Sequence, residues 1–284
     1  MKNSFSTIFL SSFLQVLGIF IVTFMILHLL PGDPIQVMLG ESASLSDQSE
    51  LRVELGLDQP IYRQIFNSIS QIIHGNFGQS ILTGAPIKEQ ILFAMKNTYI
   101  LALTSLFIAI IFGVTGGVAA AKYKDTLLDK IIISSSLFFI SIPHFFLGPL
   151  LMLFLSIWLG WLPISGMESS FSIVLPALTL SLGMLAIIIK MTRNCMIEIM
   201  NSDSVRTARS KGLSEWSITI HHIFRLVLIP LITIIGMQFG SLLSGAVITE
   251  TLFSWNGLGM LLVNSIQMLP FLLISSHLLN LVPV

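Results

Sequence analysis

Charged residues and cysteine are scarce in this sequence, and each scarcity excludes a class of protein. Charged residues make up 10% of the 284 residues and hydrophobic residues 54%, whereas a soluble domain is about a quarter charged. The 14 basic and 14 acidic side chains balance, so no net charge draws nucleic acid to the chain. The single cysteine, Cys195, cannot form an internal disulfide. The composition predicts a chain that lies in a lipid bilayer.

Two functional elements are also missing, a phosphate-binding loop and ionisable residues at membrane depth. The loop needs G-x-x-x-x-G-K-[ST], and no glycine here is followed directly by lysine. The apolar segments hold no Asp, Glu, Lys or Arg in their interiors, although carriers driven by an ion gradient usually have them. If a chain that lacks both elements takes part in energised transport, another protein must supply the energy. We expect no enzyme activity, no cofactor and no metal site.

Six apolar segments are candidates for transmembrane helices, each of which needs about 20 residues. They are residues 8–30, 98–121, 131–159, 173–189, 226–249 and 260–284. The first is too long for the apolar core of a signal peptide and has no small-residue cleavage site after it, so we interpret it as a retained anchor. The sequence predicts an all-α polytopic membrane protein with about six transmembrane helices.

Lysine and arginine predict the orientation of these segments. Ten of them lie at Lys2, in residues 122–130 and in residues 190–225, against four diluted over residues 31–97. Cytoplasmic loops carry the excess of basic residues. We therefore expect both termini in the cytoplasm and the 31–97 loop outside.

The 31–97 loop is predicted to contain an amphipathic helix. Apolar residues form one stripe over residues 60–73, Pro60 suits a helix start and Gly75 suits the position just after a helix end. Seven acidic residues against four basic ones make the loop negative. It is either a solvated surface or a docking site for an external partner.

Small residues recur at every fourth position in two of the predicted spans. The series are Gly113, Gly117 and Ala121 in the second span, and Gly236, Gly240 and Ser244 in the fifth, where Gln238 lies between the two glycines. Such faces let helices approach closely in lipid. They serve either packing within the chain, or contact with a second membrane subunit and a translocation path between subunits.

Two histidines, His28 and His144, lie in the first five predicted spans. A lone histidine there is either packed between helices and headgroups or is a contact for a substrate or metal. The sequence leaves both interpretations open.

Residues 205–216, V-R-T-A-R-S-K-G-L-S-E-W, concentrate three cationic side chains and one acidic one in an apolar chain. Ser202 or Asp203 can cap a short helix that Gly212 ends in the left-handed conformation. Ser214 can then cap a second helix that leads into the fifth span. The pattern predicts a helix, a sharp turn and a helix that project into the cytoplasm.

This projection is expected to expose apolar side chains to a partner protein. They are Val205, Ala208, Leu213 and Trp216. Exposed apolar residues on a short two-helix element suit insertion into a groove.

Seven stretches resemble one family of transport proteins. Residues 202–230, S-D-S-V-R-T-A-R-S-K-G-L-S-E-W…H-H-I-F-R-L-V-L-I-P, resemble the cytoplasmic coupling loop of permease subunits of bacterial binding-protein-dependent ABC importers, in particular those for dipeptides, oligopeptides and nickel. The other six, in order, are H-L-L-P-G-D-P (28–34), G-L-D-Q-P (56–60), H-G-N-F-G-Q-S (74–80), L-P-A-L-T-L (175–180), M-T-R-N-C-M-I-E (191–198) and G-A-V-I-T-E-T-L-F-S-W-N-G-L-G (245–259).

The resemblance implies an assembly in a bacterial inner (plasma) membrane. A second homologous permease pairs with the chain, two cytoplasmic ATP-binding subunits bind the coupling loops, and an extracytoplasmic binding protein delivers short peptides or nickel. Residues 1–97 would form an anchor and an outer loop, and residues 98–284 a permease core with the coupling loop at 190–225. The implied ATPase-coupling residues are Arg206, Thr207, Ala208, Arg209, Gly212 and Leu213.

The sequence departs from the family pattern at two places. Asn256 stands where the family usually has proline, and the uncharged end after residue 267 replaces an acidic turn, a complete last span and a basic tail. A truncated, non-transporting remnant is therefore one alternative. A stand-alone secondary carrier is the other, although the missing intramembrane carboxylates argue against it.

Overall fold

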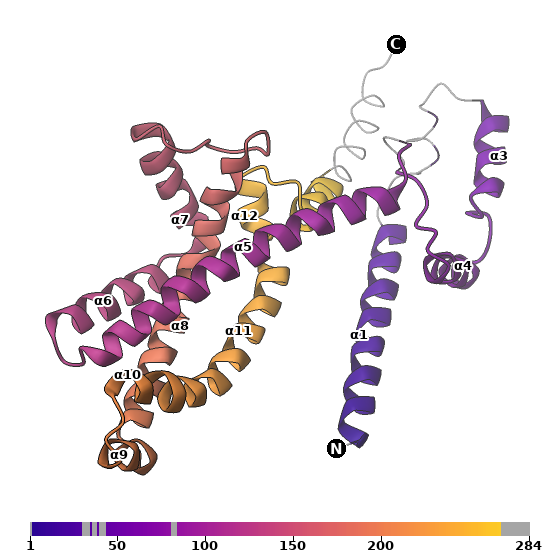
Figure 1. Cartoon of the computed structure of the whole chain (residues 1–284). Helices are drawn as coiled ribbons and strands as arrows, with labels where there is room; N and C mark the ends of the chain where they lie inside the picture. The colour runs from indigo at the N-terminus through magenta and orange to yellow at the C-terminus, as the bar shows by residue number, and fades with distance from the viewer. Residues whose placement is uncertain (1, 30–34, 36–38, 40–43, 81–83, 268–284) are drawn as a thin grey trace. The chain divides into compact units, whose positions relative to one another are not determined.

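The structure is a computed structural model that describes residues 2–29, 35, 39, 44–80 and 84–267 (Figure 1). Over these residues the regular structure is helical, apart from one isolated bridge between Gln79 and Pro86. The chain divides into two compact units, one of residues up to 91 and from 265 onward, the other of residues 92–264.

The first unit begins with α1, Lys2–Leu29, which matches the first predicted span. Two shorter helices follow, α3 (Leu45–Glu54) and α4 (Ile61–Ile73). Ser44 caps α3 by accepting a hydrogen bond of 3.2 Å from the backbone N–H of Asp47. The sequence patterns above did not predict α3, because its apolar residues are few and irregularly spaced.

The predicted amphipathic helix is confirmed as α4. Pro60 precedes its first residue, and Gly75 follows its end with φ of 76°, a backbone conformation that glycine adopts without strain. Apolar side chains such as Tyr62 and Phe66 remain exposed. The apolar stripe is therefore an open surface in this chain.

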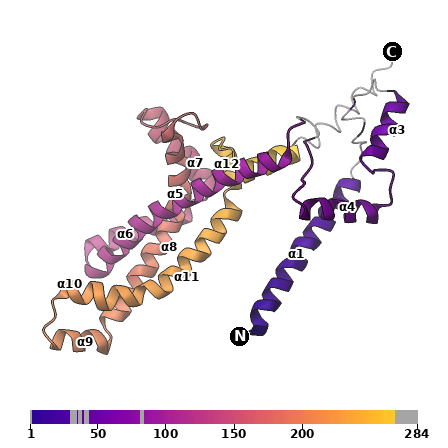
Figure 2. The same cartoon turned by 45° about the vertical axis from the view of Figure 1, so that its right-hand side comes forward.

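The second unit is a bundle of helices around α8. Its elements are α5 (Ile87–Lys122, which starts in the first unit), α6 (Leu127–Ser141), α7 (His144–Leu151), a π-helical segment (Met152–Trp158), a 3₁₀ turn (Ser170–Ile173), α8 (Val174–Met200), α9 (Asp203–Ser210), α10 (Glu215–Ser217), a second π-helical segment (Ile218–Phe224), α11 (Arg225–Gly245), α12 (Val247–Leu252) and an apolar helix, Leu258–Gln267. α8 contacts α6, α7 and α11, and in both Figure 1 and Figure 2 it lies between α6 and α11.

The core of this unit joins three long helices. Leu101 and Ala109 of α5, Ile188 of α8 and Leu231 of α11 are buried in one cluster. On α8, the buried residues of this cluster recur every three or four positions (Ala177, Leu180, Met184 and Ile188), so α8 turns one apolar stripe toward the other two helices.

The prediction of one continuous helix over residues 131–159 is wrong. α6 ends at Ser141 and α7 begins at His144, and the two axes differ by 108°. Proline disfavours a helical backbone at the residue before it, and Ile142, which precedes Pro143, is extended with φ of −91° and ψ of 121°.

Four described helices are long and apolar enough to cross a membrane, and five if the bent pair of α6 and α7 counts as one span. The fourth predicted span continues as α8 to Met200, and the fifth ends as α11 at Gly245, with α12 beginning at Val247. The predicted sixth span lies mostly outside the described residues, which include only its start. The all-α polytopic prediction is confirmed for the described helices.

Candidate functional site

The predicted turn at Gly212 is confirmed, within a segment that we call the elbow, residues 202–217. α9 ends at Ser210, and Gly212 has φ of 77°. The backbone N–H of Gly212 donates to the carbonyl of Arg209 at 2.9 Å, and that of Leu213 donates to the carbonyl of Ala208 at 3.4 Å. This pair of bonds is a Schellman motif, which ends a helix with a left-handed residue.

The second half of the elbow also begins as predicted. Ser214 precedes α10 and its hydroxyl accepts a hydrogen bond of 3.3 Å from the backbone N–H of Ser217. α10 continues through the π-helical segment Ile218–Phe224 into α11 without a loop. α10 and α11 therefore belong to one continuous helical stretch.

The expectation that Val205 and Ala208 are exposed is wrong. Their side chains are 0% and 3% exposed, and they pack with Ile218 into a buried cluster. Ala121 from the end of α5 and Met196 from α8 complete this cluster. Because Val205 and Ala208 stand three positions apart, they form the inner face of α9. Ala208 therefore packs the elbow against its own chain.

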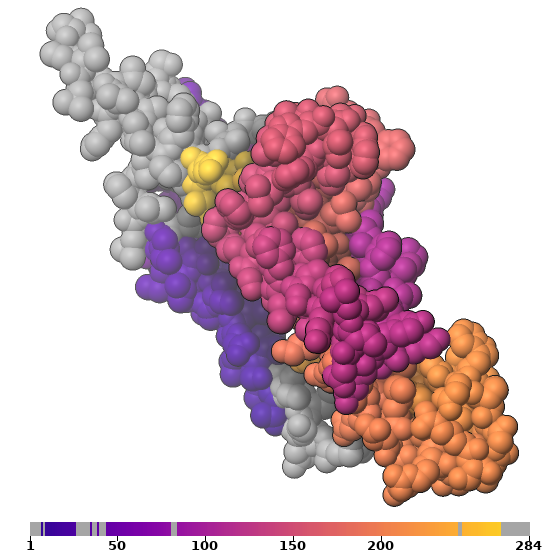
Figure 3. Space-filling view, turned by 90° about the vertical axis from the view of Figure 1, so that its left-hand side faces the viewer, coloured from indigo at the N-terminus to yellow at the C-terminus, as the bar shows by residue number. Residues whose placement is uncertain are grey.

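The outer face of the elbow remains exposed. Leu213 is 41% exposed, Trp216 is 75% exposed, and Thr207 and Lys211 are also exposed. Figure 3 shows the orange segment that contains α9 and α10 protruding from the second unit. This face presents two apolar side chains amid cationic ones.

The two arginines of the elbow already have acidic neighbours in the chain. Arg209 donates to both carboxylate oxygens of Glu215 at 2.8 and 3.2 Å, and Arg206 lies 3.6 Å from Asp203. Exposed pairs of this kind contribute little to stability. A partner carboxylate would compete with these contacts.

The two segments predicted to be cytoplasmic lie at one end of the second unit. Arg193 donates through Nε and a terminal nitrogen to the two carboxylate oxygens of Asp129 at 2.6 and 2.7 Å. The backbone N–H of Asp125 adds a bond of 3.0 Å to Asp129. This two-bond geometry fixes the start of α6 against α8.

Segments predicted to lie outside also meet. The indole N–H of Trp255 donates to the carbonyl of Asn97 at 3.0 Å, and the Asn97 amide donates to the carbonyl of Asn256 at 2.8 Å. The backbone N–H of Gly166 donates to the carbonyl of Phe253 at 2.9 Å. The start of α5 and residues 160–172 and 250–259 are therefore neighbours, as their common predicted side requires.

Glu250 is a site residue that the sequence analysis missed. Its side chain is 0% exposed, and its carboxyl oxygens bond to the hydroxyl of Thr98 at 2.6 Å and to the backbone N–H groups of Gly259 and Met260 at 2.7 and 3.2 Å. A Cβ at Gly257 would collide with this carboxyl group. The signal in the sequence was an acidic residue followed by two closely spaced glycines.

The two small-residue series lie in different surroundings. A Cβ at Gly113 would come within 2.7 Å of Ile188, and one at Gly117 within 2.5 Å of Thr192. This series is filled by α8, as the packing interpretation predicts. For Gly236 and Gly240, the described part of the chain places nothing within 4 Å of such a Cβ. The side chain of Ser244 lies outside the described residues.

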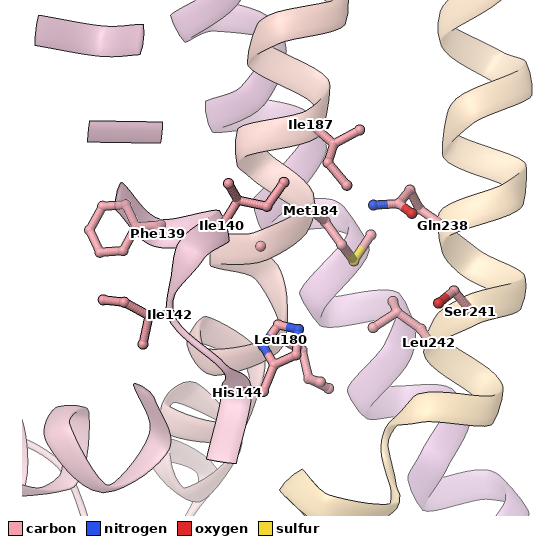
Figure 4. A pocket seen from close by; sticks show the side chains of 11 residues that line it. Phe139, Ile140, Ile142, His144, Leu180, Met184, Ile187, Gln238, Ser241 and Leu242 are labelled. Atoms are coloured by element: carbon pink, nitrogen blue, oxygen red, sulfur yellow. The ribbon is translucent and has the colours of Figure 1, made fainter. Parts of the chain in front are cut away.

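Gln238 and His144 face one cavity of about 250 Å³ (Figure 4). His144 is the first residue of α7, and its Nδ1 lies 3.1 Å from the carbonyl oxygen of Thr179. Leu180, Met184 and Ile187 of α8 also line it. The side chain of His28 lies outside the described residues, so the structure leaves its role as a prediction.

Comparisons with known proteins identify the family to which the chain is similar. Residues 113–282 match the family described as "Binding-protein-dependent transport system inner membrane component", and residues 5–87 match the corresponding N-terminal family. The chain is 37% identical over 259 residues to the "Glutathione transport system permease protein GsiC" of Escherichia coli (strain K12), covering 91% of this chain and 85% of the relative. The protein of that name from Salmonella typhimurium gives the same values.

A solved structure shares the fold. It is titled "Inward facing conformations of the MetNI methionine ABC transporter: CY5 native crystal form", with a TM-score of 0.54 and 17% identity over 68% of this chain and 90% of that one. The family match argues against the alternative of a stand-alone secondary carrier, because transport by that family depends on a binding protein. The chain belongs to the family of multi-pass inner-membrane permease subunits of binding-protein-dependent ABC importers.

Proposed function

We propose that the chain and a second permease subunit form the membrane path of an ATP-driven importer for short peptides. Two cytoplasmic ATP-binding subunits engage the elbow, and an extracytoplasmic binding protein delivers the peptide. The observation that carries this proposal is the two-sided elbow, packed on its own bundle through Val205 and Ala208 and open at Leu213 and Trp216. Coupling is the role of Arg206, Thr207, Arg209, Gly212 and Leu213.

The connection of the elbow to α5, α8 and α11 supports a mechanism of energy transfer. When the ATP-binding subunits close, they displace α9 and α10. The buried cluster around Val205 and Ile218 joins α9 to the ends of α5 and α8, and α10 runs on into α11. The displacement therefore reaches the helices that line the cavity, which can change between outward-facing and inward-facing arrangements as packed units.

The proposed orientation places both termini and the elbow in the cytoplasm. The excess of lysine and arginine in residues 122–130 and 190–225 supports it. The ion pair of Asp129 and Arg193 lies at the end of the bundle that holds these residues.

Short peptides are the proposed substrates because the relatives named above are glutathione permeases, and glutathione is a small peptide. Nickel is the alternative cargo within this family resemblance. Uptake into proteoliposomes holding the complete importer and its binding protein separates the two. We expect ATP-dependent uptake of glutathione or dialanine and none of Ni²⁺; the opposite result would overturn the substrate assignment.

The elbow is tested by Gly212→Val. Valine is strained at positive φ, so we expect normal membrane insertion and ATP hydrolysis that is no longer coupled to uptake, a loss of at least about tenfold. Gly212→Asn is the matched control, because asparagine tolerates the left-handed conformation. Unchanged uptake by Gly212→Val would contradict the coupling role.

A further inference from the structure

The cavity of Figure 4 lies where the helix of the third predicted span is broken. Ile142, whose extended backbone separates α6 from α7, lines it together with His144. A break of this kind leaves backbone groups outside the helical hydrogen-bond pattern. In transporters, discontinuous helices of this kind commonly form substrate sites.

Gln238 and Ser241 are the polar side chains that line this cavity from α11, and Gln238 is the longer of the two. Its side chain is half-buried, and within the described residues no group hydrogen-bonds to its amide. In Figure 4 it extends from α11 toward Met184 and Ile187 of α8. An amide in an apolar helix is costly unless it finds a partner, so its position across an open cavity indicates a ligand or water.

His144 adds a second polar group with a fixed orientation. Its Nδ1 donates to the carbonyl of Thr179, because a carbonyl oxygen can only accept. The neutral ring then has Nε2 as an acceptor. A Cβ at Gly183 would come within 2.9 Å of the ring, so this glycine lets the imidazole approach α8 closely.

Apart from Ser241, the rest of the wall is apolar. Leu180, Met184 and Ile187 supply it, and no Asp, Glu, Lys or Arg is among the described residues that line the cavity. Methionine fits side chains of different shapes. The lining therefore selects for a group that every peptide shares, the amide, and tolerates different side chains.

We propose that Gln238 and His144 form a transient peptide-contact site, in which the Gln238 amide bonds to the peptide bond of the passing substrate. This inference rests on the proposed function of peptide import. A side-chain amide offers two N–H donors and one carbonyl acceptor, so its carbonyl can accept a hydrogen bond from the N–H of the peptide bond, whose C=O points to the opposite side. About 250 Å³ is below the usual size of a ligand pocket, about 300–1,000 Å³, so the site holds part of a peptide at a time.

The test compares dialanine with its analogue methylated at the peptide nitrogen, in proteoliposomes with the complete importer. Gln238→Leu removes the amide at similar volume, and Thr233→Val is the matched control, a polar residue of α11 that does not line the cavity. We expect Gln238→Leu to lower dialanine uptake about five- to tenfold, the effect of one or two hydrogen bonds. Thr233→Val should stay within about twofold, with basal ATP hydrolysis unchanged.

The decisive readout is the ratio of uptake of the two substrates. The wild type should transport dialanine faster than the methylated analogue, and Gln238→Leu should lose this discrimination. Both importers use the same binding protein, so its own preference affects the ratio equally in the wild type and the variant. A Gln238→Leu ratio equal to the wild-type ratio would overturn the site. Gln238→Met carries the same expectation if the leucine variant does not accumulate. A wild type that imports Ni²⁺ and no peptide would overturn the proposed function, whereas peptide import with an unchanged ratio overturns only this site.

Discussion

The glycines of α5 and those of α11 have the same four-residue spacing and different surroundings. Gly113 and Gly117 are filled by side chains of α8, whereas a Cβ at Gly236 would meet nothing within 4 Å among the described residues. The spacing predicts that another helix approaches closely, but it does not say whether that helix belongs to the same chain. The filled series stabilises the fold, and we propose that the open one receives the second permease subunit.

The elbow repeats this contrast within a few residues. Val205 and Ala208 are buried by their own chain, and Leu213 and Trp216 are open. Apolar residues on a short helix thus divide between packing and partner contact, and only the positions of the neighbouring helices decide which applies.

The largest effect is expected for Gly117→Leu. The new side chain would collide with Thr192 and with the carbonyl of Ile189, at 2.5 and 2.8 Å from its Cβ. Overpacking of this kind costs about 1–3 kcal/mol or more, so the amount of folded protein in detergent should fall sharply. Size-exclusion chromatography measures this. Gly236→Leu should give a normal profile, and equal behaviour of the two variants would refute the contrast.

An intermediate effect is expected for Gly236→Leu. The chain should fold normally, but the side chain would hinder the approach of a second subunit, so recovery of that subunit on co-purification should fall about tenfold. Gly236→Ala retains a small residue and should assemble as the wild type does. Full recovery with Gly236→Leu would show that this face is not the pairing surface.

The smallest effect is expected for Arg209→Ala. Its pair with Glu215 is exposed on both sides, and such pairs contribute little. ATP-driven uptake should stay within about twofold of the wild type. We propose that the coupling role of Arg209 rests on exposed contacts of this small size, so a loss of tenfold or more would mean that its contact with the ATP-binding subunit is buried and stronger.

Local features of the fold were readable from the sequence. The capping residue Ser214, the positive φ at Gly212 and the helix between Pro60 and Gly75 follow from backbone preferences that act over a few residues. The break at Pro143 belongs to the same class, because the residue before a proline avoids the helical conformation. It was missed because apolar length alone was used to define the third span.

Contacts between distant residues could not be read in this way. The inward position of Val205 and Ala208 depends on Ala121 and Met196, which belong to other helices. The partners of Glu250 include Thr98, which lies on another helix. A single sequence shows which helices have an apolar face, but it does not show which other element packs against that face.

The hydrogen bonds of Glu250 have a consequence for movement. The backbone N–H of Leu258 donates to the hydroxyl of Thr98, which bonds to Glu250, and Glu250 accepts from Gly259 and Met260. Separating α5 from the 250–260 segment would break several of these hydrogen bonds at once and leave buried groups without partners, which is costly. We therefore expect Thr98, Glu250 and residues 258–260 to move as one rigid unit. The conformational change that lets a solute through should take place elsewhere in the bundle.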